Sequence, residues 1–236
     1  MSNNFPAFDL QLLERVALAG FRPNTVFDAG AAMGLWTLNA RTVFDSARYE
    51  MFEPLAGFNP AFDEGLAATS RFANIRLHPF AIGATPHIAE FHLDEEEAAG
   101  SGPASDAIVG KRAVTVKVEP LDALVASDRI EPPEIIRMDI RAGVLAALIG
   151  AQDRCLPHAH LLALRLPMTR RHGPRTPLLT EVFEYLMHED YYPFEFGLNK
   201  RDEDGLLISH DVWFIRRKSA LGKLVWLNRL DKAGDA

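Results

Sequence analysis

The stretch VFDAGAAMGLW, at residues 26–36, decides the fold that the sequence predicts. A short apolar segment ends at Asp28, a turn holds Gly30 and Gly34, and a helical pattern begins near Leu35. Glycine lets a backbone approach a ligand closely, and the exposed N–H groups at a helix start favour polar or anionic ligand groups. Taken alone, this is a tight turn between a strand and a helix. Together with an acid at the end of the next strand, it indicates a nucleotide-type pocket.

The alternation of strand and helix extends on both sides of this turn. The expected strands are 25–30, 49–54, 75–83, 134–140 and 159–167, and the expected helices between them are 34–44, 59–70 and 144–156. Strand, helix and strand at this spacing predict βαβ units and a parallel sheet.

Two regions depart from this alternation. The segments 87–96 and 113–124 alternate apolar and polar residues around a small-residue loop at 98–110, which predicts a hairpin-like excursion. Beyond residue 177, a helical pattern precedes the strand-like segments PFEFGL and DVWFIRR, which the turn-rich NKRDEDG separates. These last two segments predict an antiparallel pair at the edge of the sheet.

Length and composition limit the class of protein. The 236 residues, 48% of them apolar, predict one α/β domain at 25–218, with a helical lead-in at 1–24 and a C-terminal tail at 219–236. A formal net charge of −7 provides no basic face for nucleic acid, so a small-molecule partner is expected. No apolar run approaches the ~18 residues of a membrane span, and the N-terminus lacks the pattern of a secretory signal. We therefore expect a cytoplasmic protein without a membrane partner.

The cysteine and histidine residues point to no metal or nucleophile. The single Cys155 excludes an intrachain disulfide and lacks the surrounding pattern of a catalytic cysteine. His158 and His160 form a His-x-His pair, but no third ligand lies at a metal-like spacing. We expect no metal site.

A second carboxylate suggests an adenosine-containing cofactor. Glu53 ends the second strand, where it can accept two hydrogen bonds from the vicinal hydroxyls of a ribose. The dinucleotide fingerprint Gly-x-Gly-x-x-Gly is absent, because Ala-Ala-Met separates Gly30 from Gly34. This spacing disfavours an NAD-dependent oxidoreductase and favours S-adenosylmethionine, whose amino-acid portion Asp28 would engage directly or through water.

In the order and spacing of its motifs, the sequence resembles the FkbM-type S-adenosylmethionine-dependent methyltransferases from about Thr25 to Arg217. The resemblance rests on VFDAGAAMGLWT, YEMFEPLAGF, AIGATPHIAEFHL, VKVEPLDAL, IIRMDIRAGVLAALIGA and DVWFIRR. It implies a class I, Rossmann-like α/β fold with a mainly parallel seven-stranded sheet, an antiparallel edge and helices on both faces. It also implies O-methylation of a sugar-like or other small hydroxyl acceptor.

The resemblance also implies roles for individual residues. Those that it places at the cofactor are Gly30, Ala31, Gly34, Glu53, Ala81 and Ile82. Glu53 would hold the ribose, and Ala81 and Ile82 would lie near the adenine. Asp139 would face the transferred methyl group or the acceptor, and it is the best catalytic candidate.

Four positions depart from the usual motifs of this family. Ala32 stands where Asn is usual, Arg141 and Val144 stand where Glu is usual, and Arg165 stands where a further Glu is common. A general base typically adds ~10²–10⁴-fold to a rate, so fewer acids would slow methyl transfer without abolishing it. Alternatively, Arg141 and Arg165 would hold an anionic acceptor, since Arg pairs bidentately with such groups. The alternative is a catalytically degenerate relative that acts as a cofactor- or partner-binding module.

Overall fold

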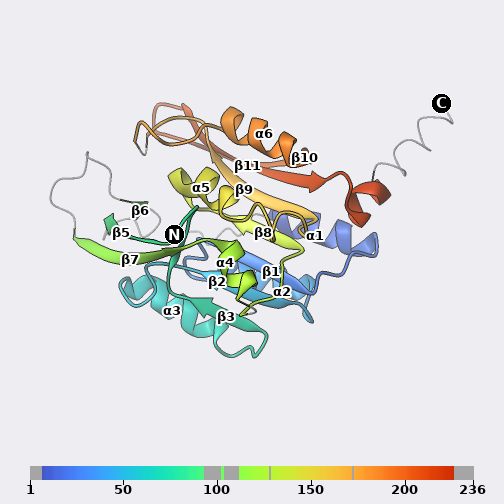
Figure 1. The fold of residues 1–236 in the computed structure, drawn as a ribbon, viewed down its shortest axis with the longest axis horizontal. Coiled ribbons are helices and arrows are strands. Elements are labelled where there is room, and N and C mark those ends of the chain that lie inside the picture. The colour runs from blue at the N-terminus through green and yellow to red at the C-terminus, as the bar shows by residue number, and fades with distance from the viewer. Residues whose placement is uncertain (1–6, 93–101, 104–111, 128, 172, 226–236) are drawn as a thin grey trace.

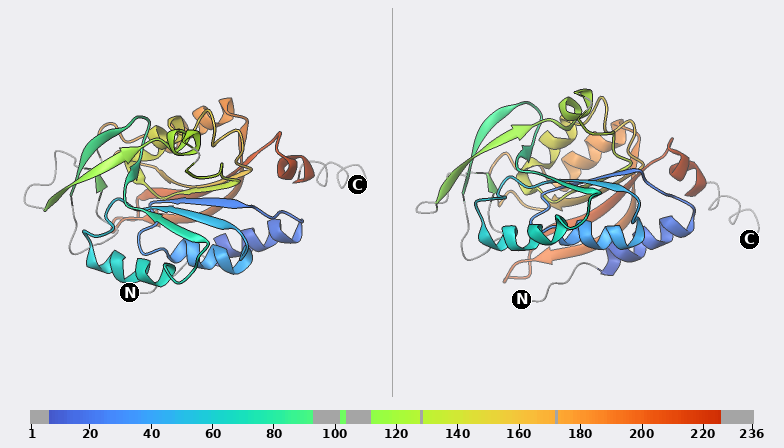
Figure 2. Two further views of the ribbon diagram at one scale, coloured as in Figure 1. Left: turned by 60° about the horizontal axis from the view of Figure 1, so that its bottom comes forward. Right: turned by 90° about the horizontal axis from the view of Figure 1, so that it is seen from below.

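The computed structural model describes residues 7–92, 102–103, 112–127, 129–171 and 173–225. A seven-stranded sheet crosses the molecule, with helices on both of its faces (Figures 1 and 2). A second, four-stranded sheet stands at one side of the main sheet (Figure 1).

The main sheet is parallel except at one edge. In spatial order its strands are β10 (Tyr191–Arg201), β11 (Leu207–Arg216), β9 (Leu161–Pro167), β8 (Ile135–Met138), β1 (Thr25–Ala29), β2 (Arg48–Phe52) and β3 (Ile75–His78). Strands β9 and β11, and β11 and β10, pair antiparallel, while the other neighbours are parallel. All five residues of β1 are buried, as expected for a strand covered on both faces. The predicted α/β fold with an antiparallel edge is confirmed.

The strand order reverses between β1 and β8. The chain runs from β1 to β2 and β3 on one side, and later places β8 and β9 on the other side of β1. In open α/β sheets, ligands bind in the crevice beyond the carboxyl ends of the strands at such a reversal. The turn at 30–34 and Asp139 both lie there.

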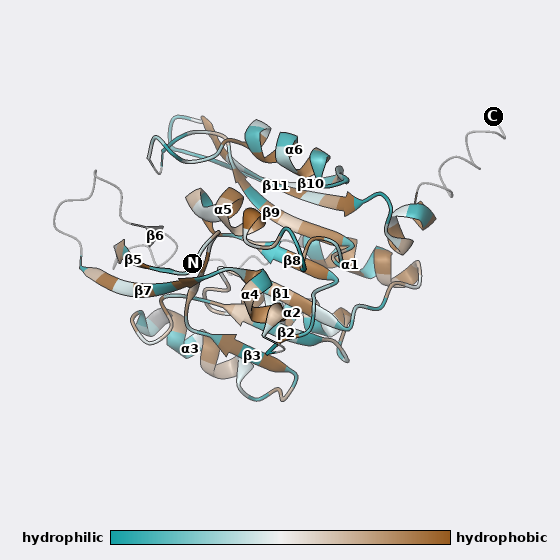
Figure 3. Cartoon of the chain, in the orientation of Figure 1, coloured by the Kyte–Doolittle hydropathy of each residue, from teal (hydrophilic) through white to brown (hydrophobic). Residues whose placement is uncertain are grey.

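Helices cover both faces of the main sheet (Figure 2). One face carries α1 (Ala7–Leu18), α2 (Leu35–Val43) and α3 (Pro60–Thr69), and the other carries α4 (Leu121–Ala126), α5 (Val144–Ile149) and α6 (Leu179–His188). Apolar residues concentrate in the central strands, whereas α6 shows polar residues on its outer side (Figure 3). Helix α1 buries Leu12, Leu13 and Val16, each worth about 1.5–3 kcal/mol. The predicted lead-in helix thus belongs to the core of the domain.

The second sheet forms the excursion that the alternating segments predict. Its strands, in order, are β4 (Ala81–Ile82), β7 (Ala113–Glu119), β5 (His87–His92) and β6 (Gly102–Pro103). Strand β7 alternates between exposed and buried residues, because one of its faces packs on apolar residues near α3. The expected single strand at 75–83 is instead two strands in different sheets. Of the expected loop at 98–110, all but Gly102 and Pro103 lies outside the described residues.

Two segments differ from the predicted elements, and Asp122 explains the second difference. Residues 121–126 form α4, although the segment 113–124 reads as one alternating strand; Pro120, which lacks an N–H donor, ends the strand. Helix α5 ends at Ile149, seven residues before the predicted end at 156. There the Asp122 carboxylate accepts hydrogen bonds from the backbone N–H groups of residues 153–155, at 2.7–3.1 Å, and so holds the chain in a tight turn.

The described part of the C-terminal tail continues the domain. Residues 220–225 are helical, and Leu221 is buried in the same apolar cluster as α1. None of the helices that the structure describes has both the length and the apolar character needed to cross a bilayer.

Candidate functional site

The glycine turn after β1 brings two strand ends into contact. Gly30 has a left-handed backbone, with φ +76°, and a Cβ atom there would collide with the carbonyl oxygen of Asp139 at the end of β8. The N–H of Gly30 donates to the carbonyl oxygen of Phe52 at 2.9 Å. Gly34 also has a left-handed backbone and begins α2, where a Cβ atom would meet Thr69 of α3. Both glycines are therefore required by close packing.

Glu53 is anchored to this turn by backbone hydrogen bonds. Its Oε2 accepts from the N–H of Ala32 at 2.8 Å, and its Oε1 accepts from the N–H of Leu55 at 2.9 Å. The non-glycine Ala32 takes a left-handed φ of +48°, which directs its N–H to the carboxylate. Burial raises the pKa of Glu53, and the two backbone hydrogen bonds partly offset that effect. The carboxylate is thus fixed at the end of β2.

A pocket of about 580 Å³ opens beside Glu53 and extends across the strand ends. The predicted site residues that line it are Gly30, Glu53, Ala81, Ile82, Asp139, Arg141 and Arg165. Its walls also include Phe62, Phe91 and Val118 from α3 and the second sheet. The fold therefore gathers seven of the ten predicted site residues around one hollow. Asp28, Ala31 and Gly34 are not among its lining residues.

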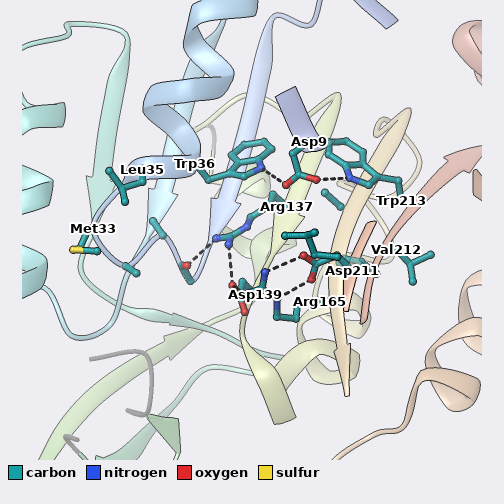
Figure 4. Close-up of a pocket in the computed structure, with 16 residues that line it drawn as sticks. Asp9, Met33, Leu35, Trp36, Arg137, Asp139, Arg165, Asp211, Val212 and Trp213 are labelled. Carbon is teal, nitrogen blue, oxygen red and sulfur yellow. Dashed lines mark hydrogen bonds and ion pairs between the residues drawn. The ribbon is translucent and has the colours of Figure 1, made fainter. Parts of the chain in front are cut away.

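A smaller pocket, of about 290 Å³, adjoins the first and shares Gly30, Ala32, Asp139 and Arg165 with it. Ala31 lines this second hollow. Asp9 of α1 lies here between two indole rings (Figure 4), and it accepts hydrogen bonds from Trp36 at 3.1 Å and from Trp213 at 2.9 Å. Burial raises the pKa of Asp9, although both indole hydrogen bonds favour the charged form.

Side chains of alternating charge are linked one to the next beside the smaller pocket, and Figure 4 shows Arg137, Asp139, Arg165 and Asp211 of this chain. Arg137 of β8 donates to Asp28 Oδ1, to the Gly30 carbonyl oxygen and to Asp139 Oδ2, each at 2.9 Å. Burial opposes the charge of Arg137, but Asp28 and Asp139 outweigh it, and the pKa of the guanidinium is raised. Thr37 Oγ1 donates to Asp28 Oδ2 at 2.7 Å. The Asp28 carboxylate, predicted to engage the cofactor, is instead fully buried and engaged by Thr37 and Arg137.

Arg165 continues this chain on β9. It donates to Asp139 Oδ2 at 2.6 Å and to the two carboxylate oxygens of Asp211 at 2.7 and 2.9 Å. Burial lowers the pKa of Arg165, but the two aspartates outweigh burial and raise it above its usual value. The predicted acceptor-binding cation is therefore already compensated by two acids. Arg141, the other predicted cation, lines the larger pocket from a left-handed backbone position with φ +51°.

Sequence reasoning missed three residues of this site. Arg137 lies two residues before Asp139 on the same strand, so the period of a β-strand already places both on one face. Asp9 and Asp211 carry no comparable signal, because they join the site only through the packing of α1 and the register of β11.

The histidine residues have structural partners. His78 lies 2.6 Å from Glu50 Oε2 and stacks on Phe52. His158 contacts the carbonyl oxygen of Arg154, while the ring of His160 packs against Phe21. In the described part of the chain, no three His, Cys, Asp or Glu side chains are grouped as a metal site.

Comparison with known structures identifies the fold. The methyltransferase FkbM from Methylobacillus flagellatus KT aligns with 80% of this chain, at 19% identity and a TM-score of 0.50. A Klebsiella pneumoniae protein classed as an O-methyltransferase aligns with 92% of this chain and 83% of its own, at 12% identity and a TM-score of 0.52. The chain has the class I methyltransferase fold. It spans 43% of the length of the FkbM structure. No protein-family model and no curated protein matches the sequence.

Proposed function

We propose that this protein is an FkbM-type methyltransferase that uses S-adenosylmethionine to methylate an oxygen of a small hydroxyl compound. One observation carries the proposal: a single pocket joins the anchored carboxylate of Glu53, at the end of β2, to Asp139, at the end of β8. In support, Asp139 follows β8 at the reversal of strand order and Glu53 follows β2, the next strand after β1, where ligands of open α/β sheets bind. The sugar-like nature of the acceptor rests on the resemblance in sequence.

The residues of this pocket fit an adenosine group. Each oxygen of Glu53 accepts one backbone hydrogen bond, so each retains a lone pair for a ribose hydroxyl. Ala81 and Ile82 contribute an apolar wall, to which an adenine ring would pack. Gly30 and Ala32 leave backbone accessible beside this wall. Asp28 would act indirectly, as a positioning residue that holds Arg137 beneath the turn.

Methyl transfer would need a correctly placed acceptor hydroxyl and a group that accepts its proton. When bound, S-adenosylmethionine supplies an electrophilic methyl group, so correct placement of a hydroxyl provides much of the acceleration. Asp139 Oδ2 is held by Arg137 and Arg165, while among the described residues its Oδ1 has no partner. We assign Oδ1 to accept the hydroxyl proton, a contribution that is typically ~10²–10⁴-fold.

Calorimetric titration tests the cofactor half of the proposal. The full chain is titrated with S-adenosylhomocysteine and S-adenosylmethionine, and we expect both to bind. Glu53→Gln should weaken binding by about tenfold or more, because a charged acceptor of two hydrogen bonds is lost. Glu64→Gln, an exposed change on α3, is the matched control and should bind normally. If the folded protein binds neither compound, the proposal is wrong; if Glu53→Gln binds normally, the ribose assignment is wrong.

A non-catalytic binding module is the second candidate, and the charge chain favours it. Arg137 and Arg165 already compensate the charge of Asp139, and Arg137 also occupies the Gly30 carbonyl oxygen. A panel of sugars and other hydroxyl compounds, incubated with S-adenosylmethionine labelled in its methyl group, separates the two candidates. Tight binding without label transfer to any compound would favour the module, and label transfer that Asp139→Asn abolishes would favour the enzyme.

A further inference from the structure

The larger pocket has an end remote from Glu53, formed by the antiparallel edge of the main sheet. Thr169 and Arg171, which follow β9, line this end together with Lys200 of β10 and Ser209 of β11. Strands β10 and β11 lie on the opposite side of β1 and β8 from β2. A ligand group at this end therefore lies across the site from an adenosine held by Glu53.

The register of the edge strands fixes two of these side chains together. Lys200 and Ser209 are directly opposite each other on the antiparallel pair β10 and β11, and Ser209 is opposite Pro167 of β9. Opposite residues in an antiparallel pair project from the same face of the sheet. The Lys200 ammonium and the Ser209 hydroxyl thus share one wall of the pocket.

The charge of this wall is positive in an acidic protein. Four cationic side chains and two carboxylates line the pocket, whereas the whole chain has a formal net charge of −7. Asp139 and Asp211 already compensate Arg165. Arg171 contacts Asp202 only at 3.3 Å, with about half of its side chain exposed. Lys200 is exposed, and in the described part of the chain no carboxylate pairs with its ammonium. Among the described residues, Lys200 is therefore the cation at this end without a carboxylate partner, and Arg171, which pairs with Asp202, lines the same end.

We propose that Arg171 and Lys200, with the hydroxyls of Thr169 and Ser209, bind an anionic group of the methyl acceptor. A guanidinium, an ammonium and two hydroxyls are donors suited to a carboxylate, a phosphate or a sulfate. The anionic group was expected at Arg141 and Arg165, and we assign it to Arg171 and Lys200 instead. That the bound anion is part of the methyl acceptor rests on the proposed function, whereas the binding of an anion at these residues does not depend on any reaction.

Matched sugars test the site on the full chain. Glucose 6-phosphate, glucuronate and glucose 6-sulfate are titrated beside neutral glucose, by calorimetry and ligand-detected NMR, at low and at high salt. At least one anionic sugar should bind about tenfold or more tightly than glucose, and the best of the three identifies the anionic group. High salt should weaken this preference, because exposed charges are screened.

Single substitutions test which residues bind the anionic sugar. Lys200→Gln and Arg171→Gln should each weaken the preferred anion by about tenfold, the usual effect of losing a charge-assisted hydrogen bond. Arg175→Gln makes the same change of charge four residues after Arg171, at an exposed residue outside the pocket, and should bind normally. Equal binding of glucose and all three anions, or equal losses in the Arg175 control, would overturn the proposal.

The titration is repeated with and without S-adenosylhomocysteine, so that the two proposals fail separately. If the anion binds and Lys200→Gln removes that binding, the anion site stands even where no adenosyl compound binds. If S-adenosylhomocysteine binds and no anion does, the cofactor assignment stands and the anion site is wrong.

Discussion

Arg165 and Asp211 face each other across the antiparallel strands β9 and β11 and form a two-bond ion pair. Nε reaches Oδ1 at 2.7 Å and Nη2 reaches Oδ2 at 2.9 Å, while the third nitrogen binds Asp139. Arg165 stands where the resembled family commonly has Glu. Acids on two neighbouring strands, Asp211 on β11 and Asp139 after β8, thus compensate the charge of Arg165.

Removing Arg165 should leave two carboxylates facing each other without a cation between them. We expect Arg165→Met to lower the free energy of unfolding by about 1–3 kcal/mol, less than a fully buried pair would lose because the guanidinium is partly exposed. Urea denaturation of this variant, of Asp211→Asn and of the double variant gives a coupling energy. A double variant that loses the sum of the two single losses would show that the ion pair contributes nothing.

Gly30 should tolerate no side chain, and Gly57 provides the comparison. Both have left-handed backbones, with φ +76° and +83°, but a Cβ atom at Gly57 has open space around it. Gly57→Ala should cost about 1–2 kcal/mol, the usual penalty for a left-handed alanine. Gly30→Ala should cost about 2 kcal/mol more, because it also forces the turn away from the Asp139 carbonyl oxygen. Equal losses in thermal or urea unfolding would show that β1 and β8 do not pack as closely as described.

The acids at the carboxyl ends of the strands could be predicted from the sequence, but the side chains that pair with these acids could not. Asp28, Glu53 and Asp139 each follow a short apolar segment, and parallel strands bring such ends to one edge of a sheet. Asp211 lies 46 residues beyond Arg165, and only the strand register pairs them. Asp28 is a second example. Its place at the end of a strand was predicted, but the local sequence did not show that Thr37 and Arg137 bind its carboxylate inside the protein.

The end of helix α5 could not be predicted from the local sequence pattern. The apolar run that starts at Val144 predicts a longer helix, but the chain turns after Ile149, where Asp122, some thirty residues earlier, accepts three backbone N–H groups. Residues 75–83 were expected to form one strand, but Pro79, which cannot donate to a strand ladder, stands where the chain leaves the main sheet for the second sheet. A contact between distant segments thus sets the end of α5, whereas the break at Pro79 has a local signal.

Replacing Ala32 with asparagine, the residue usual at this position in the resembled family, should stabilise the protein. Its left-handed φ of +48° costs an alanine about 1–2 kcal/mol, whereas Asn enters this region more readily. We expect Ala32→Asn to raise the free energy of unfolding by about 0.5–1 kcal/mol. Ala32→Val should lower it, because β-branched residues rarely adopt this conformation. Urea denaturation of both variants measures the two effects, and a stabilising valine would contradict the argument.

The free energy of unfolding should depend on pH because the pKa of Asp9 is raised in the folded protein. Burial raises its folded-state pKa above the ordinary value of 3.8, so the folded protein keeps a proton that the unfolded chain has lost. The stability that this group contributes is therefore fully present below pH 3.8 and is lost as the pH rises through the raised pKa.

Asp9→Asn isolates that dependence, because asparagine does not titrate. Its Oδ1 can accept from one of the two indoles, and its amide cannot accept from the other, so the variant bears a constant cost at every pH. The free energy of unfolding of the wild type, minus that of the variant, should fall from about pH 4 upward and become level once the pH has passed the raised pKa of Asp9. Urea denaturation at intervals between pH 4 and 8 measures this difference. A difference that stays level or grows with pH would mean that the indole hydrogen bonds, and not burial, control the charge of Asp9.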